Sequence, residues 1–206
     1  MTEKQQLFNE IDTHLQSDAA PSAYLNSISE THLFKQKPFV YLYRLKSTEQ
    51  PKKYHPEGSV WNHTMLVVDR AAEYKTKSKD IRAFMWAALL HDIGKPDTRI
   101  RNGKITSYDH EKVGAALAKE FLSEFVRDEA LVSKVSSLIR WHMQVLHVSK
   151  GLPFAEIKPM LAQTDVEEIA LLGLCDRLGR LNADVERETE SIKAFKEICL
   201  KEQRNA

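Results

Sequence analysis

Residues 88–96 read ALLHDIGKP and place a histidine and an aspartate at the end of an apolar helix. Gly94 and Pro96 follow closely, and both are usual signals that stop a helix. Because adjacent helical side chains diverge by about 100°, His91 and Asp92 can reach one point only from a helix terminus, or can serve two neighbouring points. This stretch therefore decides where a polar site can form inside an apolar fold.

Four more side chains with metal-ligand chemistry lie on the apolar stripes of other predicted helices. Each is spaced by three, four or seven residues from apolar or small residues of its own helix, which puts it on the buried face. They are His63, His110, His142 and Asp176. A single inward histidine is commonly a hydrogen-bonded core residue. Asp176 could instead pair with Arg177 or Arg180. Burying unpaired carboxylates costs several kcal/mol, however, so the joint pattern favours a shared divalent cation.

Helical periodicity continues through nearly the whole chain. Leu7, Ile11 and Leu15 form the stripe of a first helix, which is expected to end before Pro21. Asn102-Gly103 is typical of a type I′ hairpin turn. The sequence predicts an all-α bundle with one short β-hairpin near residues 99–106, short helical pieces in 22–47, an ordered loop at 48–58, and helices at 59–74, 80–91, 109–125, 128–142, 154–161, 166–178 and 185–201.

Length and composition limit the possible classes of protein. The 206 residues favour a single domain, and 30 Lys+Arg against 29 Asp+Glu give a net charge of +1. That balance argues against a broad electrostatic interaction with nucleic acid or an anionic membrane. Without a signal-peptide pattern or a long apolar run, and with two cysteines in apolar surroundings, the sequence predicts a cytoplasmic protein.

The order H…HD…H…H…D resembles the HD-domain superfamily of metal-dependent phosphohydrolases. Within that superfamily the chain is similar to the HD domain of bacterial CCA-adding tRNA nucleotidyltransferases, over about Pro38 to Arg180. The resemblance rests on YHPEGSVWNHT (54–64), ALLHDIGKP (88–96), YDHEKVGA (108–115) and CDRLGR (175–180). It implies one HD domain over 1–206, with a metal-binding core at about 38–180, on which N-terminal helices (1–37) and a C-terminal helix (185–201) pack.

The resemblance also implies a ligand set. One divalent ion would be bound by His63, His91, Asp92 and Asp176, and a second by His110 and His142, with Asp92 bridging. Nitrogen and oxygen ligands suit Fe, Mn, Co, Ni, Zn or Mg and do not choose among them. No nucleotidyltransferase head precedes the domain, so CCA addition is not implied. Asp109 stands where the subgroup tends to have glycine, and Lys95 stands where some nucleotidases of the superfamily have a catalytic glutamate.

The function expected from this resemblance is hydrolysis of a small phosphorylated substrate, such as a nucleotide or cyclic nucleotide, by metal-activated water. The expected catalytic residues are Asp92, Lys95 and Glu111, and the expected substrate-binding residues are Lys95, Arg177, Arg180, His55 and Glu57. Surface roles for the lysine, the arginines and Glu111 stay open. A mixed-valent di-iron oxygenase and a non-catalytic nucleotide- or RNA-binding module are alternatives. RNA ends gain no support from the charge, and the sequence does not indicate an oligomeric state.

Overall fold

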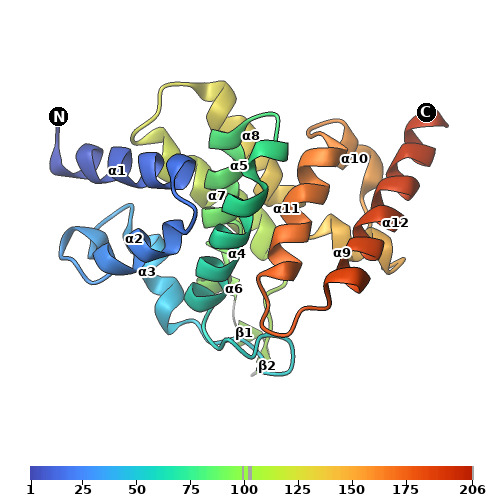
Figure 1. Cartoon of the computed structure of the whole chain (residues 1–206), viewed down its shortest axis with the longest axis horizontal. Coiled ribbons are helices and arrows are strands. Elements are labelled where there is room, and N and C mark those ends of the chain that lie inside the picture. The colour runs from blue at the N-terminus through green and yellow to red at the C-terminus, as the bar shows by residue number, and fades with distance from the viewer. Residues whose placement is uncertain (99, 102–103, 206) are drawn as a thin grey trace.

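The computed structural model describes residues 1–98, 100–101 and 104–205, and the described chain is a helical bundle, as the sequence predicts (Figure 1). The α-helices are α1 (Glu3–Ser17), α2 (Pro21–Ile28), α3 (Val40–Tyr43), α4 (Val60–Tyr74), α5 (Ile81–Leu90), α6 (Lys95–Thr98), α7 (His110–Ser123), α8 (Glu129–Trp141), α9 (Gln144–Ser149), α10 (Ile157–Leu161), α11 (Val166–Leu178) and α12 (Val185–Arg204). Short 3-10 turns η1 (Leu33–Lys35), η2 (Arg44–Ser47) and η3 (Lys75–Lys77) complete the helical part.

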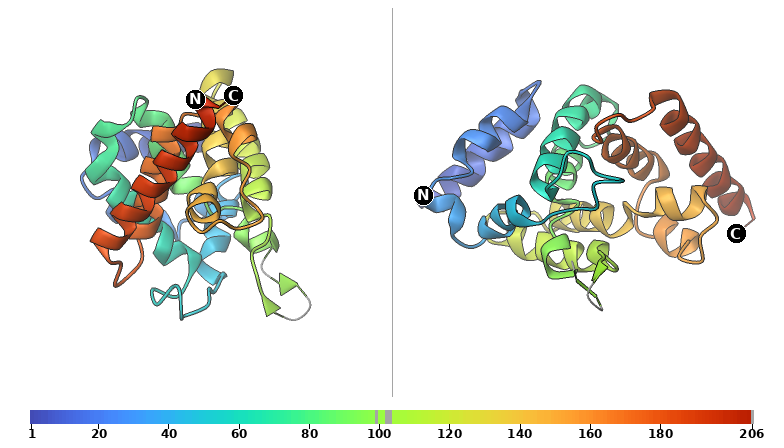
Figure 2. Two further views of the ribbon diagram at one scale, coloured as in Figure 1. Left: turned by 90° about the vertical axis from the view of Figure 1, so that its right-hand side faces the viewer. Right: turned by 90° about the horizontal axis from the view of Figure 1, so that it is seen from below.

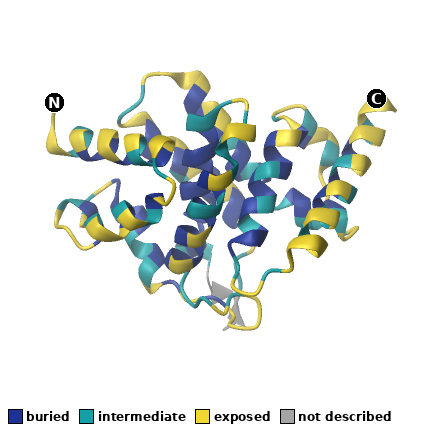
Figure 3. Ribbon diagram, in the orientation of Figure 1, coloured by how far each residue is buried: buried dark blue, intermediate teal, exposed yellow. Residues whose placement is uncertain are grey.

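The centre of the bundle is made by α4, α5, α7, α8 and α11. Helices α1 to α3 pack at one end, and α9, α10 and α12 pack at the other (Figures 1 and 2). Buried residues gather on the central helices, whereas the outer faces of α1 and α12 are exposed (Figure 3). Trp86 of α5 is fully buried and stacks on Phe8 of α1 with ring centroids 4.8 Å apart. This contact joins the N-terminal helix to the central layer.

Side-chain caps begin four of the helices that carry the site, α4, α5, α8 and α11. Ser59 accepts a hydrogen bond from the backbone N–H of Asn62 at the start of α4. Asp80, Asp128 and Asp165 cap α5, α8 and α11 in the same way. Each cap satisfies backbone donors that have no partner within the helix. The ends of these helices are thereby fixed in position.

Gly94 lies between two helices, because α5 ends at Leu90, as the stop signals predict, and α6 begins at Lys95. This position requires glycine because there is no room for a side chain. A β-carbon at Gly94 would lie 2.2 Å from the carbonyl oxygen of His110 and 2.6 Å from the amide nitrogen of Gly114. The absence of a side chain therefore lets the segment after α5 pack directly against the start of α7.

Two strands and one unexpected helix complete the fold. Strands β1 (Ile100–Arg101) and β2 (Lys104–Ile105) pair antiparallel. The predicted type I′ turn at 102–103 lies outside the described residues. Helix α9 follows directly on the end of α8, where the sequence predicted no helix.

In the part of the chain that the structure describes, none of the helices has the length and apolarity needed to cross a lipid bilayer.

Candidate metal centre

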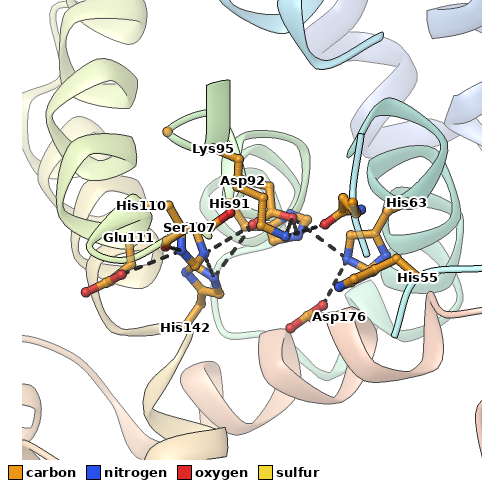
Figure 4. A network of polar contacts seen from close by, with 12 residues as sticks. His55, His63, His91, Asp92, Lys95, Ser107, His110, Glu111, His142 and Asp176 are labelled. Carbon is orange, nitrogen blue, oxygen red and sulfur yellow. Dashed lines mark hydrogen bonds and ion pairs between the residues drawn. The ribbon is translucent and has the colours of Figure 1, made fainter. Parts of the chain in front are cut away.

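The six predicted ligands meet in the middle of the bundle, most of them at helix ends (Figure 4). His91 and His142 are the residues at which α5 and α8 end, and His110 is the first residue of α7. His63 and Asp176 point inward from the bodies of α4 and α11. Helix ends allow side chains from neighbouring positions to converge, which the body of one helix does not.

The carboxylate of Asp92 lies between two groups of histidines. Its Oδ1 is 3.3 Å from Nε2 of His110 and 4.0 Å from Nε2 of His142. Its Oδ2 is 3.2 Å from Nε2 of His91 and 3.9 Å from Nε2 of His63. The two oxygens therefore face two different donor sets. His91 and Asp92 thus serve two neighbouring points, which is one of the two arrangements that their side-chain directions allow.

Asp176 extends the set on the Oδ2 side. Its Oδ1 is 3.0 Å from Nε2 of His63. The Asp176 side chain is 14% exposed, whereas those of His63 and Asp92 are 0% and 2% exposed. A small hollow beside Asp176 is lined by residues of α9 and α11, and by His142. Solvent therefore approaches the buried cluster past this aspartate.

Three of the histidines are oriented by the main chain. His91, His110 and His142 each donate Nδ1–H to the carbonyl oxygen three residues earlier, at 2.9, 2.6 and 2.7 Å. A carbonyl oxygen only accepts, so in the neutral ring the proton is on Nδ1 and the lone pair is on Nε2. Metal-binding histidines are commonly held in this way. All three Nε2 atoms face the cluster.

His63 is oriented instead by a carboxylate from the loop before α4. Oε1 of Glu57 lies 3.1 Å from Nδ1 of His63 and 2.8 Å from Nδ1 of His55. Burial alone would raise the pKa of Glu57, but the two imidazoles and a backbone hydrogen bond hold it at about 2. Burial lowers the pKa of His55 to about 4. The structure thus gives Glu57, predicted to bind substrate, a position from which it supports His63.

Lys95 reaches into the cluster and contacts Asp92 directly. Its Nζ lies 2.6 Å from Oδ2 of Asp92 and donates a 2.7 Å hydrogen bond to Oε1 of Gln50. Gln50 was not predicted, because it lies in the 48–58 loop, where no periodicity marks an inward side chain. Its neighbour Glu49 forms an isolated bridge with Ser59, which folds the loop back over the start of α4.

The remaining predicted residues lie further from the cluster. Oε2 of Glu111 is 3.7 Å from Nδ1 of His110, whose proton is already donated to a carbonyl. Arg180 approaches Asp176, with Nη2 3.8 Å from Oδ1. Arg177 is directed to α12 instead: its guanidinium lies 3.0 Å from Glu188 and donates to Ser191. These contacts favour a structural role for Arg177 over the predicted contact with substrate.

The donor set fits divalent cations. Among the residues that the structure describes, three groups have ligand atoms within 4.8 Å of one another. They are His63, His91 and Asp92; Asp92, His110 and His142; and His55, Glu57 and His63. Nε2 of His91 is buried and makes no hydrogen bond within the described chain. Buried polar atoms without hydrogen bonds are costly, and a shared cation would supply the missing partner.

Protonation in the cluster is also suited to metal binding. Burial and the neighbouring histidines lower the pKa of His142 to about 3, so its ring is neutral at pH 7. Burial alone would raise the pKa of Asp92, but His91 and Lys95 hold it well below its ordinary value. Burial would lower the pKa of His63, but Asp176 and Glu57 raise it. A cation would therefore compete with a proton at His63.

The fold and site define a helical protein with a buried histidine–aspartate cluster suited to divalent metals. The HD domain family matches residues 60–181, more than half of the chain. The protein therefore belongs to the HD-domain family. The match includes the six predicted ligands, from the first histidine on α4 to the aspartate on α11.

Its relatives include bacterial proteins described as multifunctional CCA proteins. The one from Aromatoleum aromaticum is 33% identical over 144 residues, which cover 66% of this chain and 34% of the relative. The one from Pasteurella multocida is 28% identical over 185 residues, covering 89% and 39%. An A-adding tRNA nucleotidyltransferase from Deinococcus radiodurans is 38% identical over 61 residues, covering 28% and 14%. The chain thus spans well under half the length of these relatives and is a distant homologue of the HD domain of multifunctional CCA proteins.

Proposed function

We propose that the chain is a metal-dependent phosphohydrolase with a site for two divalent ions. The observation that carries the proposal is the position of Asp92, whose two carboxylate oxygens face separate sets of histidine nitrogens. A carboxylate placed in this way is suited to bridge two ions. Membership of the HD-domain family supports the same chemistry.

The histidines and aspartates of the cluster would bind metal, and Lys95 and Arg180 would bind substrate. His63, His91, Asp92 and Asp176 would hold one ion, and Asp92, His110 and His142 the other. Divalent ions in such a site stabilise charge on phosphoryl oxygens and lower the pKa of a coordinated water. Lys95, held by Gln50 next to Asp92, would place a positive charge at the phosphoryl group. Arg180 would meet the substrate where the cluster opens beside Asp176.

The proposed substrate is a small phosphorylated molecule, with nucleotides and cyclic nucleotides as the first candidates. The net charge of +1 offers no extended attraction for long nucleic acid, so the affinity for phosphate would come from the site itself. The cluster is largely buried and opens at one edge, which favours a compact phosphoryl group. One relative is described as a tRNA nucleotidyltransferase, which supports the nucleotide class.

The test is a metal analysis followed by an activity screen. The purified chain is analysed for bound transition metals and then incubated with phosphomonoesters, 2′,3′- and 3′,5′-cyclic nucleotides and phosphodiesters. We expect phosphate or phosphomonoester release that stops with a chelator and returns with the metal. Oxygen consumption without hydrolysis would instead identify an oxygenase, and tight nucleotide binding without turnover would identify a binding module.

A further inference from the structure

Gln50 is a buried side chain with one half of its amide left unsatisfied. The residue is 7% exposed, and its Oε1 accepts a hydrogen bond from Nζ of Lys95 at 2.7 Å. Its Nε2 is buried and has no hydrogen-bond partner among the residues that the structure describes. Buried amide donors are normally paired, so the open donor needs an explanation.

The orientation of the amide follows from its neighbour. A lysine ammonium group only donates hydrogen bonds, so the amide must present its oxygen to Lys95. The nitrogen is bonded to the same carbon, which keeps its two N–H groups next to the ammonium group. Rotating the amide would place two donors against each other and lose the bond. The unsatisfied donor is therefore a consequence of the contact with Lys95.

Lys95 and Gln50 together form a small group of donors beside Asp92. The ammonium group of Lys95 uses two contacts, one to Oδ2 of Asp92 at 2.6 Å and one to Gln50. An ammonium group has three N–H bonds, so one remains. The two N–H groups of the amide add to it. Three donors that no described protein group accepts thus lie at the edge of the candidate metal centre.

We propose that Gln50 is a substrate-binding residue whose Nε2 donates to a non-bridging oxygen of the phosphoryl group, next to the oxygen that Lys95 binds. The inference rests on the proposed phosphohydrolase function and adds a residue to it. Gln50 has two effects: it holds the ammonium group of Lys95 in place through Oε1, and it binds phosphate directly through Nε2. The backbone of the loop supports this placement, since Gln50 donates its own N–H to the carbonyl of Gly58 at 3.1 Å.

Binding of inorganic phosphate to the full-length chain tests the proposal. The protein is loaded with the metal found by elemental analysis, and phosphate affinity is measured by calorimetry. Gln50→Met keeps the length of the side chain and removes both functions of the amide. We expect the dissociation constant for phosphate to rise by about tenfold or more, because hydrogen bonds to charged groups are among the stronger ones.

A double variant separates direct binding from support of Lys95. In a Lys95→Met background the supporting effect is absent, and adding Gln50→Met should still weaken phosphate binding several-fold. If the second substitution has no effect there, Gln50 acts only through Lys95 and direct donation is wrong. Thr48→Val is the matched control, because Thr48 is buried in the same loop and its hydroxyl donates, among the described residues, only to the carbonyl of Arg44.

The remaining outcomes also decide the question. Unchanged phosphate affinity in Gln50→Met, with unchanged metal content and melting temperature, overturns the inference. Failure of the metal-loaded wild-type chain to bind phosphate overturns it too. The hydrolysis screen tests the proposed function separately: turnover that persists in Gln50→Met with an unaltered KM leaves the hydrolase in place and removes Gln50 from its site.

Discussion

The two sides of Asp92 are built in different ways. On the Oδ1 side, His110 and His142 are buried, and each is held by a main-chain carbonyl three residues earlier. On the Oδ2 side, His63 is held by side chains alone, Glu57 from the loop at 48–58 and Asp176 from α11. His91 on the Oδ2 side is also held by a main-chain carbonyl, that of Ala88. The two sides therefore differ at His63, whose partners are distant in sequence.

The two sides of Asp92 also differ in how far they are exposed to substrate. Both histidines on the Oδ1 side have a main-chain partner three residues earlier, so the local backbone orients their rings. The Oδ2 side includes Lys95 and the partly exposed Asp176, and it lies where the cluster opens. We infer that the Oδ1 side mainly fixes metal, whereas the Oδ2 side fixes metal and receives substrate.

Substituting Asp92 is expected to have the largest effect, because it removes the one carboxylate among the described residues that faces both sets of histidines. Asp92→Ala should lose bound metal and lower turnover by roughly 10³-fold or more, since each lost factor of ten costs about 1.4 kcal/mol of transition-state stabilisation. Elemental analysis and phosphate release measure the two effects. Asp97→Ala, on an exposed aspartate paired with Arg44, is the control. Turnover by metal-free Asp92→Ala protein would refute the metal-dependent mechanism.

Removing one histidine from each side should separate the two ions. His142→Ala is expected to reduce the metal content from two ions to one and to spare the ion near His63. His63→Ala should do the opposite and should also weaken substrate binding. Metal analysis, with KM and kcat determined separately, distinguishes the two variants. His147→Ala is the control, since His147 packs on Phe154 outside the cluster. Equal losses in both variants would mean that the sides do not bind metal independently.

Glu57→Gln should affect the Oδ2 side alone and by a smaller amount. The amide keeps the shape of the side chain but removes the negative charge that lies 3.1 Å from Nδ1 of His63. Partners of metal-binding histidines typically contribute 10–100-fold in metal affinity, so we expect a loss of about that size for one ion. Competition with a chelator measures it. A uniform loss of both ions would show that Glu57 supports the whole cluster.

Periodicity predicted which side chains converge, and it also explains where Arg177 lies. His63, His110, His142 and Asp176 were predicted from their spacing on apolar stripes, and the structure brings them together. Arg177 follows Asp176 directly, so the two side chains diverge by about 100° on α11, and Arg177 meets α12. Arg180, four residues after Asp176, lies on the same face and approaches it.

Two contacts of the cluster that the sequence did not predict, those of Gln50 with Lys95 and of Glu57 with His63, come from the loop before α4. Gln50 and Glu57 lie among prolines and a glycine, where no regular spacing relates sequence position to side-chain direction. Their inward placement depends on the bridge between Glu49 and Ser59 and on contacts with Lys95 and His63. Such contacts are tertiary, so local sequence carries no signal for them.

Asp80 offers the smallest and most general test, since it caps α5, the helix that leads into Asp92 and therefore serves both sides. Oδ1 of Asp80 accepts from the N–H of Ala83 at 3.0 Å, and Oδ2 pairs with Lys134 at 2.6 Å. Asp80→Ala should lower the free energy of unfolding by about 1 kcal/mol. Urea denaturation measures this change, and the ratio of the two metal ions should stay as in the wild type. A change in that ratio would mean that α5 positions one side more than the other.

The same aspartate makes a pH-dependent contribution to stability with a definite sign. Burial alone would raise the pKa of Asp80, but Lys134 and the N–H of Ala83 lower it below its ordinary value of about 4. A carboxyl group whose pKa is lowered by folding stabilises the protein above the unfolded-state pKa, and this contribution is lost as the pH falls through the lower folded-state value. Asp80→Asn keeps a good cap without the charge, so it should be less stable than wild type at pH 6, and the difference should be smaller at pH 3. If the stability difference between wild type and Asp80→Asn is the same at both pH values, the charge of Asp80 does not stabilise α5 and its effect is that of a neutral cap.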